Sequence, residues 1–464
     1  MNATIPAAEA AANSTIVLGA WIAGLRYEDI PTAAREHAKL CLLDSVGCGL
    51  FGATLPWGAI SADTAVELAP GGGASLWGSG RRAGPGATAM ANGTAVHGFE
   101  LDDIHVQSVF HPGATVIPAV LAVAESRGGM SGRQVLTAIV AGYEAGIRIG
   151  IAAGVGQALR GFHQTGTVGA AAAAAGVARL LDLDADAATH ALGIGATQAA
   201  GLYCARMGAM AKRFHAGHAA EAGVTAGLLA SRGFTGSTEV LEAPVGGFLS
   251  ALGENATPSE IAHELGQRWE TAKVGFKAHA SCASAHTIVD GVDDLMRQGL
   301  TADNLQHMRI SLSRISVNNV GWTYKPADVV AAQMNGFYTA AVKLLDGRAF
   351  VEQYLENRLT DPRILALIKR IAIEHDPELD KGGPAMRHAS RVEATLVDGT
   401  TLRTYNEQRR GSYTRPLTRE EVAEKFRHTA KTALGREQVE ELERLLLTID
   451  ELPTLDRVSA LLLG

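Results

Sequence analysis

Residues 168–182 read V-G-A-A-A-A-A-A-G-V-A-R-L-L-D, and this stretch sets the character of the first half of the chain. Alanine is the strongest helix former, and a core rich in Ala and Leu but short of aromatics suits closely packed helices. Ala- and Leu-rich segments with a 3.6-residue period recur at about 31–53, 113–127, 131–153, 184–200 and 212–232. Because strand patterns are hard to find among them, residues 1–270 predict an all-helical domain.

A Gly-rich stretch from Pro70 to Gly93 interrupts the helical pattern. It lacks the G-x-x-x-x-G-K-[ST] phosphate-loop motif, and no clear buried strand precedes it. We therefore expect a plain surface connection there.

Strand patterns begin after about residue 270. Met308 to Ser316 alternates partly between apolar and polar residues, which predicts a half-buried strand. Val392 to Tyr405 predicts a β-hairpin closed by a type I′ turn at Asp398-Gly399. A helix is expected between them, from Ala327 to Leu345.

The helical pattern returns at Thr418, which stands at a capping-box spacing from Glu421. We expect these last helices to pack back on the first domain. The predicted fold is therefore mainly α, with a discontinuous all-helical domain of residues 1–270 and 410–464 and a smaller α+β lid domain of residues 271–409. A cleft between two such domains is a common location for a small-molecule site.

Composition and charge exclude several classes of protein. The 464 residues are 47% apolar and 19% charged, as in globular chains. The net charge is −7 and there is no basic stripe, so no nucleic-acid partner is expected. The N-terminus lacks a basic region, its first Arg being Arg26, and the longest apolar run is too short for a membrane span. The four cysteines show no C-x-x-C spacing, so we expect a soluble, cytoplasmic protein.

The densest group of titratable residues is H-G-F-E-L-D-D-I-H-V-Q-S-V-F-H-P-G, residues 97–113. If this segment is helical, His97, Glu100 and Asp103 share one face and Asp102 lies beside His105. Pro112-Gly113 would then turn the chain and leave His111 near a loop end. Such a group could form an acid-base centre, bind a metal, or simply be a hydrogen-bonded helix end.

Two further clusters carry histidines and positive charge. His163 precedes a predicted helix start, whose free N–H groups would favour a bound carboxylate, although an isolated histidine there could also be a local cap. Lys212, Arg213, His215 and His218 form a cationic spot on an otherwise apolar helix, or a solvated step at its start.

A last cluster places Lys277, His279, Cys282 and His286 where the predicted domains meet. Cys282 and His286 are four residues apart, so they could belong to a zinc site or an activated thiol, or Cys282 could be a buried structural cysteine.

Together these clusters suit a small molecule with two or more carboxylates. The lysines would hold the carboxylates and stabilise the negative charge that develops when a neighbouring C–H is ionised, while a histidine or carboxylate takes the proton. The sequence shows no Rossmann fingerprint, Walker motif or pyridoxal-phosphate-like context, so no organic cofactor is expected.

The motifs resemble, in order, those of the MmgE/PrpD family, from about residue 15 to about residue 430. They are H-G-F-E-L-D-D (97–103), H-P-G (111–113), G-F-H-Q-T-G-T-V-G (161–169), A-K-R-F-H-A-G (211–217), K-A-H-A-S-C-A-S-A-H (277–286), Q-M-N-G-F-Y-T-A-A (333–341) and R-G-S-Y-T-R-P-L-T-R-E-E-V-A-E-K-F (410–426). The resemblance implies a helical domain with a smaller α+β lid, a homodimer, and an active site between the domains without an obligatory metal.

The resemblance also places the family's site residues on this chain. The matching positions are Glu100, Asp102 and Asp103 for its D-x-D-D run, His111 and His163 for its histidines, and Lys212 and Lys277 for its lysines. Glu100 replaces the usual first Asp, Ile104 stands where a Thr is often found, and His279 replaces an aromatic residue. H-P-G also stands where the better-known dehydratases have H-P-S.

From this resemblance we expect proton transfer next to a substrate carboxylate. The expected catalytic residues are Asp102 and His163 on one side of the substrate and Lys277 or Cys282 on the other. The expected substrate-binding residues are Glu100, His111, Lys212, His215 and His279.

The favoured hypothesis is epimerisation of an aminodicarboxylate such as iminodisuccinate, because Ile104 removes a hydroxyl and His279 adds a titratable group. Dehydration of the 2-methylcitrate type and decarboxylation of the cis-aconitate type are the alternatives within the family. Two other classes remain. One is a hydrolase with His97, Asp102, Asp103 and His105 as metal ligands, and the other is a non-catalytic carboxylate-binding protein.

Overall fold

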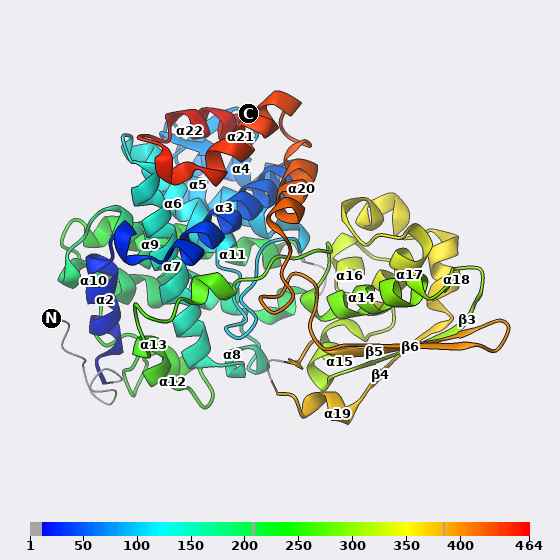
Figure 1. Cartoon of the computed structure of the whole chain (residues 1–464). Coiled ribbons are helices and arrows are strands. Elements are labelled where there is room, and N and C mark those ends of the chain that lie inside the picture. The colour runs from blue at the N-terminus through cyan, green and yellow to red at the C-terminus, as the bar shows by residue number, and fades with distance from the viewer. Residues whose placement is uncertain (1–11, 207–208, 384–385) are drawn as a thin grey trace.

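The computed structural model describes residues 12–206, 209–383 and 386–464, and Figure 1 shows a large helical part beside a smaller part that mixes helices with a sheet. The chain is 59% helical, which confirms the prediction of a mainly α fold with a smaller α+β part. The helical part contains α2 (Ser14–Gly24), α3 (Thr32–Ala53), α4 (Pro56–Leu68), β1 (Ala74–Leu76), β2 (Arg81–Ala83), α5 (Pro85–Val96), α6 (Gly113–Arg127), α7 (Gly132–Ala153), α8 (Gly156–Leu159), α9 (Gln164–Leu180), α10 (Ala185–Ala196), α11 (Ala211–Ala230), α12 (Phe248–Leu252), α13 (Ser259–Ala262), α20 (Arg419–Ala430), α21 (Arg436–Leu447) and α22 (Asp456–Leu463).

The mixed part lies between α13 and α20 in the sequence. It contains α14 (Ala283–Arg297), β3 (Leu305–Leu312), α15 (Arg314–Val320), α16 (Val329–Gln333), α17 (Gly336–Asp346), α18 (Pro362–Ile368), β4 (Ile371–His375), α19 (Pro377–Asp380), β5 (Ser390–Leu396) and β6 (Thr401–Asn406). After this part the chain returns to the helices, because α20 and α21 pack on α3 and α22 packs on β1 (Figure 1).

Small residues allow the helices of the helical part to approach one another closely. At the crossing of α5 and α11, a Cβ atom on Gly217 would lie 2.2 Å from the Met90 carbonyl oxygen, and one on Gly93 would lie 3.0 Å from the Gly217 Cα. A larger residue would therefore force the two helices apart. The prediction of a surface connection from Pro70 to Gly93 is wrong in its second half, because α5 is buried between α3, α6 and α11.

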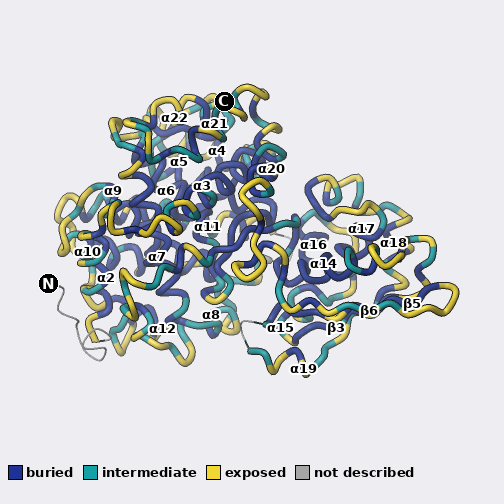
Figure 2. The backbone as a smooth tube through the Cα atoms, viewed as in Figure 1, coloured by how far each residue is buried: buried dark blue, intermediate teal, exposed yellow. Residues whose placement is uncertain are grey.

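The deepest burial follows α6, α7 and α9, which Figure 2 shows as largely dark blue. Helix α7 is long and apolar enough to cross a membrane by length and composition alone, but 94% of that apolar window is buried inside the fold. It is therefore a core helix of the helical part, and its start is fixed by a capping box between Ser131 and Gln134.

The mixed part is built on a four-stranded sheet of order β4-β3-β5-β6. β3 pairs in parallel with β4, while β5 pairs antiparallel with both β3 and β6. α14 and α17 cover one face of this sheet (Figure 1). The other face carries charge, such as the ion pair between Arg309 and Glu393 with an N–O distance of 3.0 Å. This one-sided burial explains the alternation that predicted the strands.

Two local predictions for the mixed part need correction. The hairpin of β5 and β6 is confirmed, but its turn is not type I′, because only Gly399 has a positive φ, of 85°, whereas a type I′ turn also needs one at Asp398. The helix expected from Ala327 to Leu345 is divided into α16 and α17, because the Asn335 side chain accepts a hydrogen bond from the Tyr338 N–H and starts a new helix.

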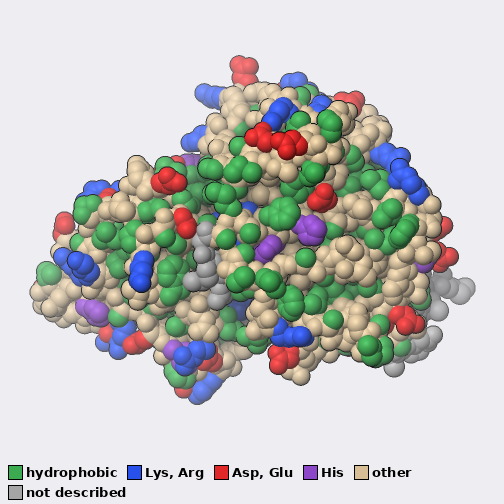
Figure 3. Space-filling view, turned by 180° about the vertical axis from the view of Figure 1, so that it is seen from behind, with side chains coloured by type: hydrophobic (Ala, Val, Ile, Leu, Met, Phe, Trp, Pro, Cys, Tyr) green, Lys and Arg blue, Asp and Glu red, His purple; other side chains and the backbone are tan. Residues whose placement is uncertain are grey.

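Charged side chains of both signs are scattered over the face that Figure 3 shows, and they form no continuous basic stripe there. The chain as a whole carries a net charge of −7.

Candidate active site

A cavity of about 480 Å³ lies between the helical part and the mixed part. Its titratable lining residues include Glu100, His111, His163 and Lys212 from the helical part, and Lys277, Cys282, Arg387 and His388 from the mixed part. The structure thus brings together six of the nine predicted site residues, and the volume suits a small organic molecule.

Glu100 joins the cations of this cavity. The chain leaves α5 through a 3₁₀ turn, His97–Phe99, and Glu100 then takes a left-handed conformation with φ of 56°. Lys212 donates a hydrogen bond to Glu100 Oε1, and Lys277 Nζ lies 3.1 Å from Glu100 Oε2. The expected helix over this segment is therefore wrong, because the left-handed residue ends it and turns the Glu100 carboxylate toward the lysines.

Positive charge exceeds negative charge around Glu100. Arg213 Nη1 lies 3.3 Å from Glu100 Oε1, so three cationic side chains share one buried carboxylate. Burial alone would raise the pKa of Glu100, but Lys212, Lys277 and Arg213 hold it well below its ordinary value. Burial also lowers the pKa of Lys212, against the attraction of Glu100. An excess of buried positive charge favours a ligand that carries more than one negative charge.

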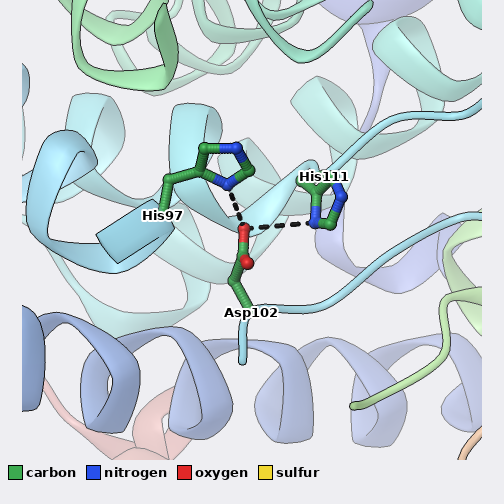
Figure 4. Close-up of side chains that lie close together, drawn as sticks. All are labelled: His97, Asp102 and His111. Carbon is green, nitrogen blue, oxygen red and sulfur yellow. Dashed lines mark hydrogen bonds and ion pairs between the residues drawn. The ribbon is translucent and has the colours of Figure 1, made fainter. Parts of the chain in front are cut away.

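Asp102 holds two histidines in place (Figure 4). Its Oδ2 atom lies 2.6 Å from His97 Nδ1 and 3.2 Å from His111 Nδ1. Burial lowers the pKa of His97 to about 4, so this ring is neutral near pH 7 and donates its Nδ1 proton to Asp102. Asp102 is fully buried and is absent from the cavity lining, whereas His111 lines it. Asp102 therefore acts through His111, by fixing the orientation of its ring.

The ligand atoms of His97, Asp102 and His111 lie within 4.8 Å of one another, which makes them a candidate metal site. Two atoms bound to one tetrahedral zinc ion would be about 3.3 Å apart, since the Zn–N and Zn–O bonds are about 2.0–2.2 Å long. The 2.6 Å between His97 Nδ1 and Asp102 Oδ2 is instead the length of a charge-assisted hydrogen bond. The arrangement fits a hydrogen-bonded pair of His97 and Asp102, with His111 beside it, better than a metal site.

The four ligands of the hydrolase hypothesis do not converge on one point. Asp103 accepts hydrogen bonds from the Tyr143 hydroxyl at 2.7 Å and from the Gly113 N–H at 2.9 Å. His105 Nε2 lies 3.3 Å from Glu270 Oε2 and pairs with that carboxylate instead. The structure therefore offers no support for that metal-dependent class.

His163 is the N-cap residue of α9 and lines the cavity, while His215 of α11 lies behind it. The Nδ1 atoms of the two rings are 3.0 Å apart, so one ring donates a hydrogen bond to the other. Burial, reinforced by the neighbouring positive charge of Lys212, lowers the pKa of His163 well below its ordinary value. His163 is thus a neutral ring near pH 7, able to accept or pass on a proton.

The two predicted residues near the start of α14 take different places. Cys282 is the N-cap residue of α14 and lines the cavity, and burial raises the pKa of its thiol. An activated thiolate is therefore not formed there. His279 faces a separate cavity of about 330 Å³, and its Nε2 lies 3.3 Å from Asp290. The structure does not place His279 beside the predicted substrate.

Buried ion pairs and hydrogen bonds outside the expected site residues support the segment that carries Asp102. Lys425 of α20 lies 2.7 Å from Asp44 of α3 and donates a hydrogen bond to the Leu101 carbonyl oxygen. Burial, with the nearby charge of Asp44, raises the pKa of Asp103 to about 8. Lys425 and Asp103 therefore fix both ends of the short segment that carries Asp102. Lys425 belongs to the motif of residues 410–426, but the motif does not reveal its partners, which lie more than 300 positions away.

Two family models cover most of the chain. Residues 17–261 match the MmgE/PrpD N-terminal domain, and residues 279–451 match the MmgE/PrpD C-terminal domain. Together they include every predicted site residue except Lys277, which lies between the two matched segments.

Curated relatives align over nearly the whole chain. The chain is 32% identical to the cis-aconitate decarboxylase-like protein oryM of Aspergillus oryzae, over 97% of this chain and 98% of the relative. It is also 32% identical to the cis-aconitate decarboxylase of Aspergillus terreus, over 95% of this chain and 94% of the relative. A mitochondrial 2-methylcitrate dehydratase of Yarrowia lipolytica is 25% identical, over 81% of this chain and 76% of the relative. By their names these relatives are lyases, and the chain belongs to the MmgE/PrpD family of enzymes.

Proposed function

We propose that this enzyme is a decarboxylase that removes CO₂ from a small unsaturated polycarboxylate of the cis-aconitate type. The observation that carries the proposal is the meeting of Lys212, Lys277 and Arg213 on the single carboxylate of Glu100 at the cavity between the two parts of the chain. The names of the relatives that align over nearly the whole chain support the same reaction class.

The reaction needs an anion site and a proton donor. When the C–C bond to the departing carboxylate breaks, CO₂ leaves and the electron pair stays on the remaining carbon skeleton, where one proton must be added. Lys212 and Lys277 bind the carboxylates that remain and stabilise the negative charge as it develops. Lys212, whose pKa is lowered by burial, and His111, oriented by Asp102, are the candidate proton donors.

Each turnover consumes one proton, so the donor has to be protonated again. His163 lines the cavity and His215 lies behind it, with 3.0 Å between their Nδ1 atoms. This pair offers a path for a proton to the site from the helical part.

Epimerisation remains a prediction without support from these relatives. It requires acid-base groups on both faces of the substrate; Lys277 and Cys282, which were expected on the second face, line the cavity, whereas the added titratable group His279 faces another cavity. The homodimer and the cytoplasmic location likewise stay predictions.

The proposed reaction is tested by incubating the purified protein with cis-aconitate in D₂O and following the products by NMR. Release of CO₂ with one deuterium in a dicarboxylate product is the expected result. The same incubation is repeated with 2-methylcitrate. If the protein converts it to an unsaturated tricarboxylate without loss of CO₂, the enzyme is a dehydratase and not a decarboxylase. Deuterium exchange into an unchanged aminodicarboxylate, with loss of optical rotation, would replace it by epimerisation. A Lys212→Met variant that abolishes turnover serves as the control for a contaminating enzyme.

A further inference from the structure

Arg387 is a buried cation that lines the cavity, and none of the carboxylates in the described part of the chain pairs with it. Its side chain is 6% exposed, lines the cavity and lies three residues before β5. Its Nε atom donates a hydrogen bond to His388 Nε2 at 3.2 Å. Among the described residues, the groups whose electrostatic interaction favours its charge are Tyr203 and Cys282, and neither is a carboxylate. Burial lowers the pKa of Arg387 to about 10, so the guanidinium still carries its charge at neutral pH.

The backbone around Arg387 is held firmly by the helices of the mixed part. The Arg387 carbonyl oxygen accepts hydrogen bonds from the hydroxyls of Ser313 and Ser316, at 2.5 Å and 2.7 Å. The His388 carbonyl oxygen accepts one from the Thr287 hydroxyl of α14 at 2.5 Å. The guanidinium is therefore presented to the cavity from a fixed position, and a buried charge without a partner costs free energy unless a ligand supplies the partner.

The start of α14 lines the same cavity. Cys282, Ala283 and Ser284 form the N-cap and first turn of this 15-residue helix, and all three line the cavity. The N-terminal end of a helix carries a partial positive charge that favours an anion. Two independent features, a helix start and an unbalanced guanidinium, thus point toward one negatively charged group.

We propose that Arg387 and the first turn of α14 form a second carboxylate subsite, separate from the cluster of Lys212, Lys277 and Glu100. This subsite rests on the proposed function and assigns two carboxylates of the substrate to two separate sets of groups, one held by each set. The planar guanidinium can hold both oxygens of a carboxylate at once, which a lysine cannot do. A monocarboxylate would leave one set of cations without a partner, and it is therefore bound more weakly.

The subsite is tested by calorimetric titration with tricarballylate, a saturated tricarboxylate that has no double bond to react. We expect the Arg387→Gln variant to bind it about 10- to 100-fold more weakly than the wild-type protein. Arg387→Lys should lie between the two, because it keeps the charge but loses the paired hydrogen bonds. The matched control is Arg391→Gln, four residues further on, whose guanidinium pairs with Asp376 on the exposed side of β5. It should bind tricarballylate within about twofold of the wild-type affinity.

Binding of butyrate, which has a single carboxylate, tests the selectivity. The wild-type protein should prefer tricarballylate to butyrate, and Arg387→Gln should reduce that preference. Unchanged affinity for tricarballylate in Arg387→Gln would overturn the subsite, and so would a wild-type protein that does not bind tricarballylate at millimolar concentration. If circular dichroism shows that Arg387→Gln is unfolded, Arg387→Lys decides in the same way.

The outcomes separate this proposal from the proposed reaction. A wild-type protein that decarboxylates cis-aconitate while Arg387→Gln keeps full affinity would remove the subsite and leave the reaction. A wild-type protein that releases no CO₂, but binds tricarballylate in a way that depends on Arg387, would leave the subsite and remove the reaction.

Discussion

Replacing Lys277 by Met removes a cation from the cavity while keeping the length of the side chain. Lys277 is 1% exposed, and its Nζ lies 3.1 Å from Glu100 Oε2. Two unit charges about 4 Å apart interact by about 4 kcal/mol when the effective dielectric constant is about 20. A substrate carboxylate that takes such a position beside Lys277 loses most of this energy in the variant. We therefore expect kcat/KM to fall by about 10²- to 10³-fold, which is the usual cost of removing one group that stabilises developing charge.

The fold should tolerate this change. Glu100 keeps Lys212 and Arg213 as partners, so no buried anion is left without a cation. Exchanging a buried charge for an apolar group of similar volume is often neutral for stability. Thermal unfolding of Lys277→Met should therefore stay close to that of the wild-type protein.

The assay is the initial rate of CO₂ release from cis-aconitate, with Lys273→Met as the matched control. Lys273 Nζ also lies 3.1 Å from a carboxylate, that of Glu270, but its side chain is 38% exposed and does not line the cavity. This control should keep kcat/KM within about twofold of the wild-type value, because exposed ion pairs contribute little. If Lys277→Met retains half of the wild-type kcat/KM, or if the control loses as much as Lys277→Met, then Lys277 does not stabilise charge on the substrate.

Three further predictions concern stability and the thiol. Lys425→Met leaves Asp44 buried without its cation, so urea unfolding should show a loss of about 3–5 kcal/mol, and an unchanged midpoint would contradict the role given to this pair. Burial raises the pKa of Glu125 to about 7 in the folded state, against 4.5 when it is exposed. The folded state therefore binds more protons between these values, and stability should fall by up to about 3 kcal/mol as the pH rises through this window. Glu125→Gln should flatten the difference in Tm between pH 5 and pH 8, and a slope equal to that of the wild-type protein would speak against this assignment. Cys282→Ser should lower kcat by no more than about tenfold, because a thiol with a raised pKa is no nucleophile, and a much larger loss would show that the thiol reacts.

The helices were predictable where the sequence shows both a 3.6-residue apolar period and a residue that marks the start or the end of the helix. α6 and α7 begin and end within a residue of the expected segments, because Gly128 follows one helix and the capping box at Ser131 starts the other. α5 was missed because its Gly and Ala residues look like a loop when they are read alone. Their small size allows α5 to contact α11 closely. The close approach of Gly217 to α5 becomes visible only when the two helices are placed together in the structure.

The candidate site was predictable in its residue types but not in its geometry. The motifs name Glu100, Lys212 and Lys277, and the structure places all three at one cavity. Spacing along the chain suggested a helix through Glu100, but a left-handed residue turns its side chain toward the cations instead. Arg387 was not found because an unbalanced charge is defined by the absence of neighbours, which no sequence motif records.

We expect a polycarboxylate to bind between the two parts of the chain, with its negative charges on the buried cations. A crystal structure of the protein with tricarballylate bound tests this most directly. One carboxylate should lie within hydrogen-bond distance of Lys212 and Lys277, and another within hydrogen-bond distance of Arg387. Density for the ligand in the separate cavity beside His279, or at an exposed surface only, would contradict it.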